Sequence, residues 1–323
     1  MTRTTTGSAG ATSAASATAP GAATTPTTPA WLPVAAVAVT LLLWASAFVA
    51  IRYLGDDFSP GALSLGRLLV GAVCLAAVAL PRGLPRPSGR DLLTIAAIGV
   101  LWFGVYNVAL NEGERRVDAG TAAMLIQVSP VLIALLAATF LSERFTVYLG
   151  LGLALAFGGV ALIALSTSPG GNSDVVGVAL CIVSAVTYSI SVILQKPLMS
   201  RLQAVHVVWL ACTVGALACL PFAGQLWRET AAAPASSILW VVYLGVFPTA
   251  IAFTTYAFAL QHMSASSLGV TTYLVPPITI VLGLVFLGEA PPAMAYVGGA
   301  LALVGVAVAR RKPRTLARVP AGA

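Results

Sequence analysis

One stretch of this chain occurs twice, and the duplication restricts the folds that the chain can adopt. Residues 119–163 align with residues 265–309 at a constant offset, without a gap. Of the 45 aligned positions, 13 are identical, whereas chance in so biased a composition gives about 5. Each copy contains an apolar stretch with a proline near its middle, a glutamate at its end and a second apolar stretch. The chain is therefore expected to fold as two related halves.

The composition indicates a membrane protein. Hydrophobic residues make up 59% of the chain and charged residues only 8%, whereas about a quarter of the residues of a soluble domain are charged. Backbone amides in hydrocarbon must pair within their own segment, so long apolar stretches without alternating polarity predict helices. We predict an all-α integral membrane protein with ten transmembrane helices, because ten stretches have the length needed to cross a bilayer. They are residues 31–54, 60–81, 92–111, 119–141, 146–166, 175–196, 205–226, 237–260, 265–287 and 292–309.

The ten predicted helices divide into two sets of five. The run Ser166–Asp174 is polar and rich in turn-forming residues, which predicts a boundary there. The first repeat would occupy residues 31–166 and the second residues 175–309. Because five is odd, the second repeat enters the membrane from the opposite side, and the two repeats are inverted. Residues 1–29 predict a disordered cytoplasmic tail, and residues 310–323 predict a basic cytoplasmic tail near anionic headgroups.

Membrane topology explains the net charge of +7, so the charge does not indicate a nucleic-acid partner. With the N-terminus in the cytoplasm, most Lys and Arg residues fall on the cytoplasmic side. Arg115, Arg116 and Arg228 fall outside, and Arg52 and Arg67 lie within spans. This asymmetry agrees with the positive-inside rule. We therefore expect a multi-pass protein of the cytoplasmic (plasma) membrane with both termini in the cytoplasm.

Two matching motifs resemble the EamA domain of the drug/metabolite transporter superfamily. The first joins Gly113–Pro130 to Phe140–Glu143, and the second joins Ser264–Pro276 to Phe286–Glu289. The opening Trp44–Phe48 is also similar. The resemblance implies a carrier of ten helices, built as two inverted five-helix repeats, that moves small metabolites, amino acids or drugs, often outward. It also implies that the first, third, fourth, sixth, eighth and ninth spans line a central path.

Prolines interrupt the two duplicated spans at the same position. Pro130 and Pro276 each lie near the middle of a span, and Pro277 adds a second break in the later copy. Proline removes an internal hydrogen bond and kinks a helix, and a polar cavity can supply new partners for the freed carbonyls. We expect these breaks to shape and hinge a substrate cavity between the repeats. The alternative is a packing kink without further function.

Polar and aromatic residues within the spans are candidates for lining that cavity. Polar groups could hydrogen-bond a substrate while aromatic rings contact its apolar part. The alternative for each residue is an ordinary bond between helices, which polar side chains often form in membranes. The candidates are Trp44, Ser46, Phe48, Tyr106, Asn107, Asn111, Gln127, Ser129, Tyr188, Ser191, Tyr256, Thr272 and Tyr273.

Arg67 is the candidate for binding an anionic group. It lies about 10 Å into the second span at the helical rise, and cations at such depth are costly and usually functional. Arg67 could bind a substrate carboxylate, extend its side chain to the outer headgroups, or pair with Asp56 or Asp57. Arg52 lies closer to the membrane boundary, where we expect its charged end to reach the headgroups.

Two glutamates end the matched spans and are the candidates for coupling transport to protons. Glu143 and Glu289 occupy equivalent positions, where a carboxylate could instead cap a neighbouring helix, the role that we favour. No Asp or Glu lies in the middle of a predicted span. We therefore predict that a carboxylate switch at mid-membrane depth is absent, and that transport is facilitated or coupled through a glutamate at a helix end.

The sequence favours a secondary transporter, an exporter or facilitator that works by alternating access. The expected partners are a small-molecule substrate and membrane lipid; a monomer suffices, and a homodimer is possible. A membrane-embedded enzyme would need clustered His, Asp, Glu or Cys, and a structural or sensory protein would need a sizeable domain outside the membrane. No Cys or His spacing indicates a metal site, and we expect no cofactor.

Overall fold

The computed structural model describes residues 31–143, 145–166, 175–288 and 293–309, together with Thr4 and Pro29. All secondary structure in this part of the chain is helical. The α-helices before residue 170 are α1 (Trp31–Leu54), α2 (Pro60–Ala79), α3 (Gly89–Ile98), α4 (Tyr106–Arg116), α5 (Ala119–Leu125), α6 (Ser129–Phe140) and α7 (Val147–Ser166). Those after it are α8 (Val175–Leu198), α9 (Ala204–Ala218), α10 (Ala223–Ala232), α11 (Ala235–Leu244), α12 (Ala252–His262), α13 (Ala265–Thr271), α14 (Val275–Leu287) and α15 (Ala293–Ala309).

Shorter helical segments join several of these helices. Two of them are π-helical, η2 (Gly99–Val105) and η5 (Gly245–Ile251). The others are turns of 3-10 helix: η1 (Leu80–Arg82), η3 (Ile126–Val128), η4 (Leu220–Phe222) and η6 (Thr272–Leu274).

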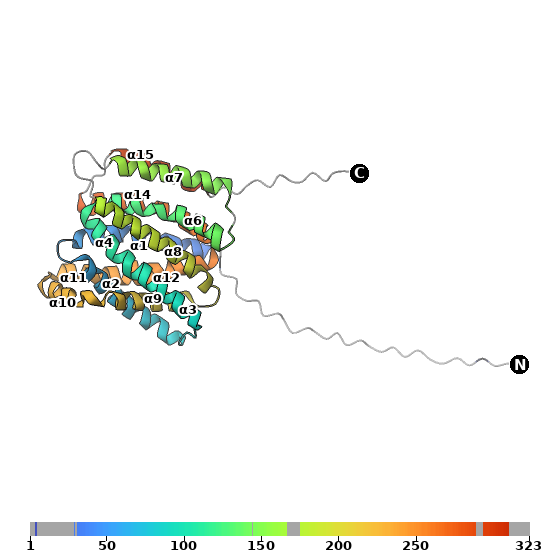
Figure 1. Cartoon of the computed structure of the whole chain (residues 1–323), viewed down its shortest axis with the longest axis horizontal. Helices are drawn as coiled ribbons and strands as arrows, with labels where there is room; N and C mark the ends of the chain where they lie inside the picture. Colours follow the sequence, from blue (N-terminus) through green and yellow to red (C-terminus); the bar gives the residue numbers. More distant parts are fainter. Residues whose placement is uncertain are drawn as a thin grey trace.

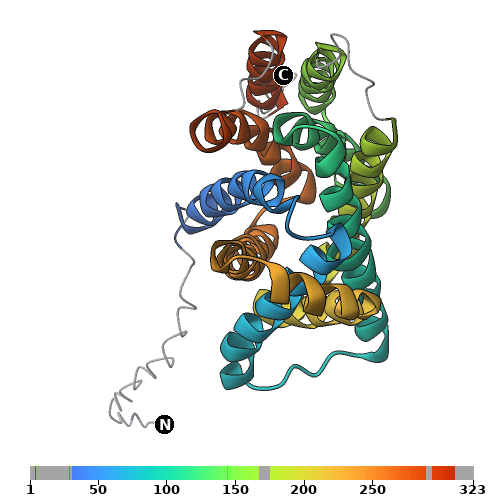
Figure 2. The ribbon, with the colours of Figure 1, turned by 90° about the vertical axis from the view of Figure 1, so that its left-hand side faces the viewer.

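The protein crosses the membrane several times. α7 and α15 are apolar and pack along each other at one edge of the bundle (Figures 1 and 2). A bent pair, Ala204–Ala218 with Leu220–Ala232, is a further span if it is counted as one. In the described residues, 7 other helical stretches are long and apolar enough to span: Trp31–Leu54, Pro60–Arg82, Gly89–Arg116, Ala119–Phe140, Val175–Leu198, Ala235–His262 and Ala265–Leu287.

The internal duplication extends beyond the stretch that the sequence alignment detects. The helices α3 to α7 begin at positions that match the starts of α11 to α15 under the offset of the aligned stretch, as Gly89 matches Ala235. The π-helical segments η2 and η5 have the same offset, and so do the turns η3 and η6. The first helices, α1 and α8, match at a slightly smaller offset, since they begin at Trp31 and Val175. Each half therefore repeats the same succession of elements, except that α10 of the second half has no counterpart among the described residues of the first.

The first two helices of each half pack against helices of the other half. The first helix of each half packs against the other half: α1 contacts α12 and α14, and α8 contacts α4 and α6. The second helices do the same, because α2 packs on η5 and α9 packs on η2. Glycines allow these close approaches, as small residues do between membrane helices. A Cβ on Gly245 would lie 2.5 Å from Cβ of Val70, and a Cβ on Gly99 would lie 2.6 Å from Cβ of Val214.

The two proline-interrupted spans run antiparallel and cross at their breaks. α5 packs on α14 and α13 packs on α6, so the start of each span meets the end of the other. Pro130 and Pro276 follow the 3-10 turns η3 and η6 directly, at the first turn of α6 and α14. Gln127 in η3 donates through Nε2 to the carbonyl oxygen of Thr272 in η6, at 2.5 Å. The breaks are thus adjacent, as the sequence analysis expected.

Two predicted spans differ from the observed helices. The third was predicted over residues 92–111, but its helical stretch runs over Gly89–Arg116, so Glu114 lies in its last turn and is buried. The seventh was predicted as one span over residues 205–226. The chain instead bends by 52° between α9 and α10, at the turn η4, where Pro221 interrupts regular helical bonding. The predicted tails, apart from Thr4 and Pro29, and Glu289 lie outside the described residues.

Candidate functional site

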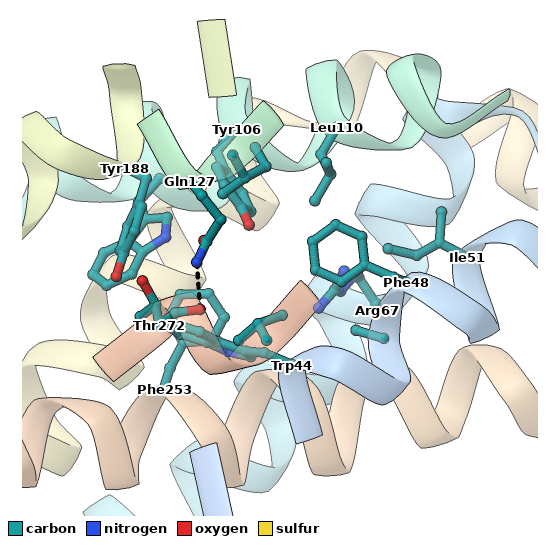
Figure 3. A pocket seen from close by; sticks show the side chains of 14 residues that line it. Trp44, Phe48, Ile51, Arg67, Tyr106, Leu110, Gln127, Tyr188, Phe253 and Thr272 are labelled. Carbon is teal, nitrogen blue, oxygen red and sulfur yellow. Dashed lines mark hydrogen bonds between the residues drawn. The ribbon is translucent and has the colours of Figure 1, made fainter. Parts of the chain in front are cut away.

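A cavity lies where the two interrupted spans cross (Figure 3). Its walls come from both halves of the chain: α1, α2, the η2–α4 span, η3, α8, α12 and the η6–α14 span. Its volume is about 40 Å³, room for about three water molecules at roughly 10–15 Å³ each. The lining residues are Trp44, Ala47, Phe48, Ile51, Arg67, Trp102, Tyr106, Leu110, Ile126, Gln127, Tyr188, Phe253, Thr272 and Val275.

The cavity brings together half of the candidates that the sequence analysis selected. They come from six different spans, and they combine aromatic rings with a cation, an amide and a hydroxyl. Figure 3 shows Arg67 and Phe48 on one side, Tyr188 on the other, and Gln127 joined to Thr272 between them. The candidates that line the cavity are Trp44, Phe48, Arg67, Tyr106, Gln127, Tyr188 and Thr272.

The remaining candidates on α1, α4 and α8 bond to neighbouring helical backbone or to other helices. Ser46 Oγ lies 2.6 Å from the hydroxyl of Tyr243. Asn107 donates to the carbonyl oxygens of Trp102 and Phe103, which lie in the π-helical segment η2. Asn111 donates to Ser64 Oγ at 2.9 Å, and Ser191 donates to the carbonyl oxygen of Thr187. The contacts of Ser46 and Asn111 are bonds between helices, as in the alternative interpretation, whereas Asn107 and Ser191 bond within their own spans.

Ser129, Tyr256 and Tyr273 also lie outside the cavity wall. Ser129 donates to the carbonyl oxygen of Ile126. The hydroxyls of Tyr256 and Tyr188 are 2.9 Å apart, so Tyr256 supports a lining residue from behind. Tyr273 packs instead into a separate apolar cluster with Leu149 and other residues. Its position is equivalent to that of Gln127 under the offset of the repeat, but the two side chains enter different surroundings.

Two aromatic residues of the cavity wall were missed by the sequence analysis. Trp102 and Phe253 line the cavity, and Trp102 is only 1% exposed. Trp102, Tyr106 and Leu110 are four residues apart, which places them on one helical face. The sequence analysis chose Tyr106 on this face, but it also chose Asn107 and Asn111 of the same span, which do not line the cavity. An aromatic residue four positions before Tyr106 was the signal that could have identified the lining face.

The aromatic side chains form a packed wall around one end of the cavity. The ring centroids of Trp44 and Tyr256 are 4.9 Å apart, and those of Trp44 and Phe253 are 5.5 Å apart. Trp102 lies 5.0 Å from both Tyr188 and Phe253. Edge-to-face and tilted pairs at these separations are mutually attractive. The indole nitrogen of Trp44 is buried and has no hydrogen-bond partner among the described residues.

Arg67 lies in the cavity wall rather than at the membrane boundary. Arg67 is only 4% exposed, so its side chain does not extend to the outer headgroups. Its Nε donates to Thr249 Oγ1 at 3.1 Å. Asp57, one of the two aspartates considered as a partner, accepts instead from Ser237 Oγ at 2.5 Å. Among the described residues, Arg67 therefore neither reaches the headgroups nor pairs with Asp56 or Asp57. It remains in position to bind a substrate carboxylate.

The basic residues that end α1 and α8 have equivalent contacts in the two halves. Arg52 Nη1 donates to the carbonyl oxygen of Glu114 at 3.1 Å. Lys196 Nζ donates to the carbonyl oxygen of Leu260 at 2.5 Å and to that of Met263 at 2.6 Å. Glu114 and Leu260 occupy equivalent positions of the two repeats. Each cation therefore caps the carbonyl end of α4 or α12, where the helix dipole favours positive charge.

A second, polar cavity adjoins the ends of α1 and α4, and we call it the α1-end vestibule. Its volume is about 480 Å³. Ile51 lines both the vestibule and the central cavity, so this side chain lies between the two spaces. Glu114, which is 1% exposed, contributes the buried acid that the shorter predicted span had excluded. The vestibule residues are Ile51, Arg52, Tyr53, Gly55, Asp56, Glu114, Arg115 and Leu287.

Glu143 joins the two halves at the end opposite the vestibule. Its carboxylate accepts hydrogen bonds from the backbone N–H of Ala265 at 2.8 Å and of Ser266 at 3.1 Å. It also accepts from Ser266 Oγ at 2.5 Å. These are the contacts of a helix cap, because they satisfy unpaired N–H groups at the start of α13. Glu289, its equivalent in the second half, lies outside the described residues.

Comparison with known proteins identifies the family. The model of the EamA-like transporter family matches residues 31–165 and again residues 175–311, which together make up most of the chain. The chain belongs to the EamA-like transporter family. It is therefore a membrane transporter of the drug/metabolite type. In the described residues, no group of three or more His, Cys, Asp or Glu could hold a metal ion.

Several relatives support this assignment. A protein of Streptantibioticus cattleyicolor named a probable terminal-alkyne amino-acid exporter is 41% identical over 88% of this chain and 94% of its own length. An uncharacterized transporter of Archaeoglobus fulgidus is 30% identical over 85% of this chain and 98% of its own. One crystal structure is 22% identical, covers 86% of this chain and 96% of its own, and has a TM-score of 0.66. The last comparison concerns the fold alone.

Proposed function

We propose that this EamA-family protein is a secondary carrier that exports small amino acids with unbranched apolar side chains across the cytoplasmic membrane. The observation that carries the proposal is the central cavity, because it lies where the two halves cross and combines one cation with aromatic walls. Arg67 would bind the carboxylate of the substrate, and the rings of Trp44, Trp102 and Phe253 would contact its apolar part. The name of the Streptantibioticus cattleyicolor relative agrees with this class of substrate.

The fold that we propose consists of ten transmembrane helices in two inverted five-helix repeats, over residues 31–166 and 175–309. The equivalent starts of the helices support the repeats, and the antiparallel crossing of the interrupted spans supports their inversion. With the basic residues on the inner side, both termini lie in the cytoplasm and the α1-end vestibule opens outward. A monomer encloses the whole cavity, so transport requires no second copy.

Alternating access accounts for the contrast between the two ends of the cavity. Among the described residues, only the side chain of Ile51 is common to the walls of the α1-end vestibule and the central cavity, whereas Glu143 joins the start of α13 to the first repeat at the opposite end. The central volume of about 40 Å³ is smaller than the roughly 300 Å³ at which ligand pockets begin. The cavity must therefore widen to admit a substrate, and the hydrogen bonds of Glu143 must break when the opposite end opens.

The proposal is tested by exchange of norvaline, a five-carbon linear amino acid, in proteoliposomes. Vesicles loaded with unlabelled norvaline should take up labelled norvaline faster than protein-free vesicles. Arg67→Gln should reduce this exchange at least about tenfold, because hydrogen bonds to charged groups contribute about 1.5–3 kcal/mol. Arg228→Gln is the matched control, since Arg228 is exposed and does not line the cavity. Exchange by Arg67→Gln at the wild-type rate would contradict the assigned site.

A further inference from the structure

A single threonine orients the cation of the cavity. Thr249 lies in the π-helical segment η5 and is 1% exposed. Its Oγ1 accepts from Arg67 Nε at 3.1 Å and donates to the carbonyl oxygen of Leu244 at 2.8 Å. A hydroxyl has one proton to donate, so its donation to Leu244 leaves an oxygen lone pair to accept from Arg67. The carbonyl lies five residues before Thr249, which is the spacing of a π-helix.

This contact determines which edge of the guanidinium remains available. Arg has five N–H donors in a planar fork, and one of them, on Nε, is occupied by Thr249. The two terminal nitrogens have no hydrogen-bond acceptor in the part of the chain that the structure describes, and Arg67 lines the cavity. The edge formed by both terminal nitrogens is the one that a carboxylate can bind through two parallel hydrogen bonds.

The charge of the cavity wall also favours a carboxylate. Among the described lining residues, Arg67 has the only formal charge. The buried acid Glu114, whose charge also acts on Arg67, lines the adjoining vestibule and not this wall. A substrate carboxylate would therefore be the counter-ion of Arg67 within the cavity. The ammonium of an amino acid finds no carboxylate in the wall and would rest against another aromatic face, such as that of Tyr106.

Comparison of the two halves indicates that the fold does not require the contact between Arg67 and Thr249. Under the offsets that relate the repeats, Arg67 is equivalent to Ala211 and Thr249 is equivalent to Phe103. The second interface, between α9 and η2, packs closely without a cation or a hydroxyl there, because Ala211 and Phe103 are both fully or almost fully buried. The framework therefore does not need a polar pair at this position. The pair in the first interface serves the cavity.

We propose that Thr249 is a positioning residue that holds Arg67 so that both terminal nitrogens face the substrate carboxylate. This inference rests on the proposed function, since it presumes that Arg67 binds the substrate. It also implies that a carboxylate is required for binding, whereas the ammonium contributes less. Thr249 acts through Arg67 and makes no contact with the substrate itself.

The test measures equilibrium binding of two probes to the purified full-length protein in lipid nanodiscs. Norvaline has the carboxylate, and norvaline amide lacks it. Thr249→Val keeps the shape of the side chain but removes the hydroxyl, and should weaken norvaline binding at least about tenfold while leaving the weak binding of norvaline amide unchanged. Thr249→Ser, which keeps the hydroxyl, should restore norvaline binding to within about twofold of the wild type. Thr279→Val, which alters another buried threonine outside the cavity wall, should bind both probes normally.

The outcomes distinguish the positioning role of Thr249 from the proposed function, in which Arg67 binds the substrate carboxylate. If Arg67→Gln weakens norvaline binding but Thr249→Val does not, the positioning role is wrong and the carboxylate site stands. If Thr249→Val weakens both probes equally, Thr249 is merely structural, and the inference is overturned. If the wild type binds norvaline no better than norvaline amide, or Arg67→Gln binds norvaline normally, the carboxylate site and the inference fail together.

Discussion

Gln127 and Tyr273 occupy equivalent positions in the two halves, yet they have different surroundings. Gln127 reaches across the crossing point to the backbone of Thr272, whereas Tyr273 turns toward the apolar cluster near α7. The side chain of Gln127 therefore joins the two 3-10 turns from one side only. This asymmetry makes Gln127 the residue whose amide holds the two interrupted spans together at their breaks.

Gln127→Met tests this contribution, because it keeps the length of the side chain and removes the donor. The carbonyl of Thr272 then loses a partner in a buried position, which costs about 1–3 kcal/mol. We expect a lower midpoint of thermal unfolding in detergent. Gln261→Met is the matched control: its amide also donates to backbone carbonyls, of Met199 and Leu202, but at 3.3 Å and in a part-buried position. Equal shifts for the two variants would contradict a special role for Gln127.

At the scale of elements, glycine spacing sets how closely the second helix of one half approaches the π-helical segment of the other. A Cβ on Gly99 would lie 2.7 Å from the carbonyl oxygen of Ala211, and backbone cannot move aside as a flexible side chain can. Gly99→Ala should therefore destabilise the protein by about 1–3 kcal/mol through overpacking. Gly283→Ala is the control, because nothing lies within 4 Å of its added Cβ.

The measurement is the midpoint of thermal unfolding of both glycine variants in the same detergent. Gly283→Ala should leave it unchanged or raise it, since alanine favours a helix more than glycine does. Gly99→Ala should lower it. A Gly99→Ala protein as stable as the wild type would mean that the α9–η2 interface yields easily, and that glycine is not what determines its spacing.

The sequence predicted the elements better than the side-chain directions. Proline marked both breaks correctly, because Pro130 and Pro276 follow the 3-10 turns. The π-helical segments were not predicted, although Pro248 inside η5 interrupts regular helical bonding there. In the third span the sequence analysis selected Tyr106, which lines the cavity, together with Asn107, which does not, and it missed Trp102. The length of that span was underestimated because Glu114 reads as a surface residue until burial shows otherwise.

At the scale of the whole molecule, neither half can bury its own surface. α1 packs on helices of the second half and α8 on helices of the first. Both halves line the cavity, the first with ten residues and the second with four. Arg67 finds its partner Thr249, and Gln127 its partner Thr272, across the boundary. A half alone would expose these polar groups to lipid, which is costly at membrane depth. The two repeats are therefore expected to fold as one unit.

Expression of the chain as two separate fragments, residues 1–170 and 171–323, tests this expectation. Produced together, with an affinity tag on one fragment only, they should co-purify as a stable complex in a one-to-one ratio. Produced alone, each fragment should be degraded or should aggregate when extracted in mild detergent. The readouts are the composition of the purified complex and its elution volume, so the test does not depend on the substrate. A lone fragment that forms a stable, monodisperse homodimer would show that a repeat can replace its partner with a second copy of itself, and that the differences between the repeats at Arg67 and Gln127 are not needed for assembly.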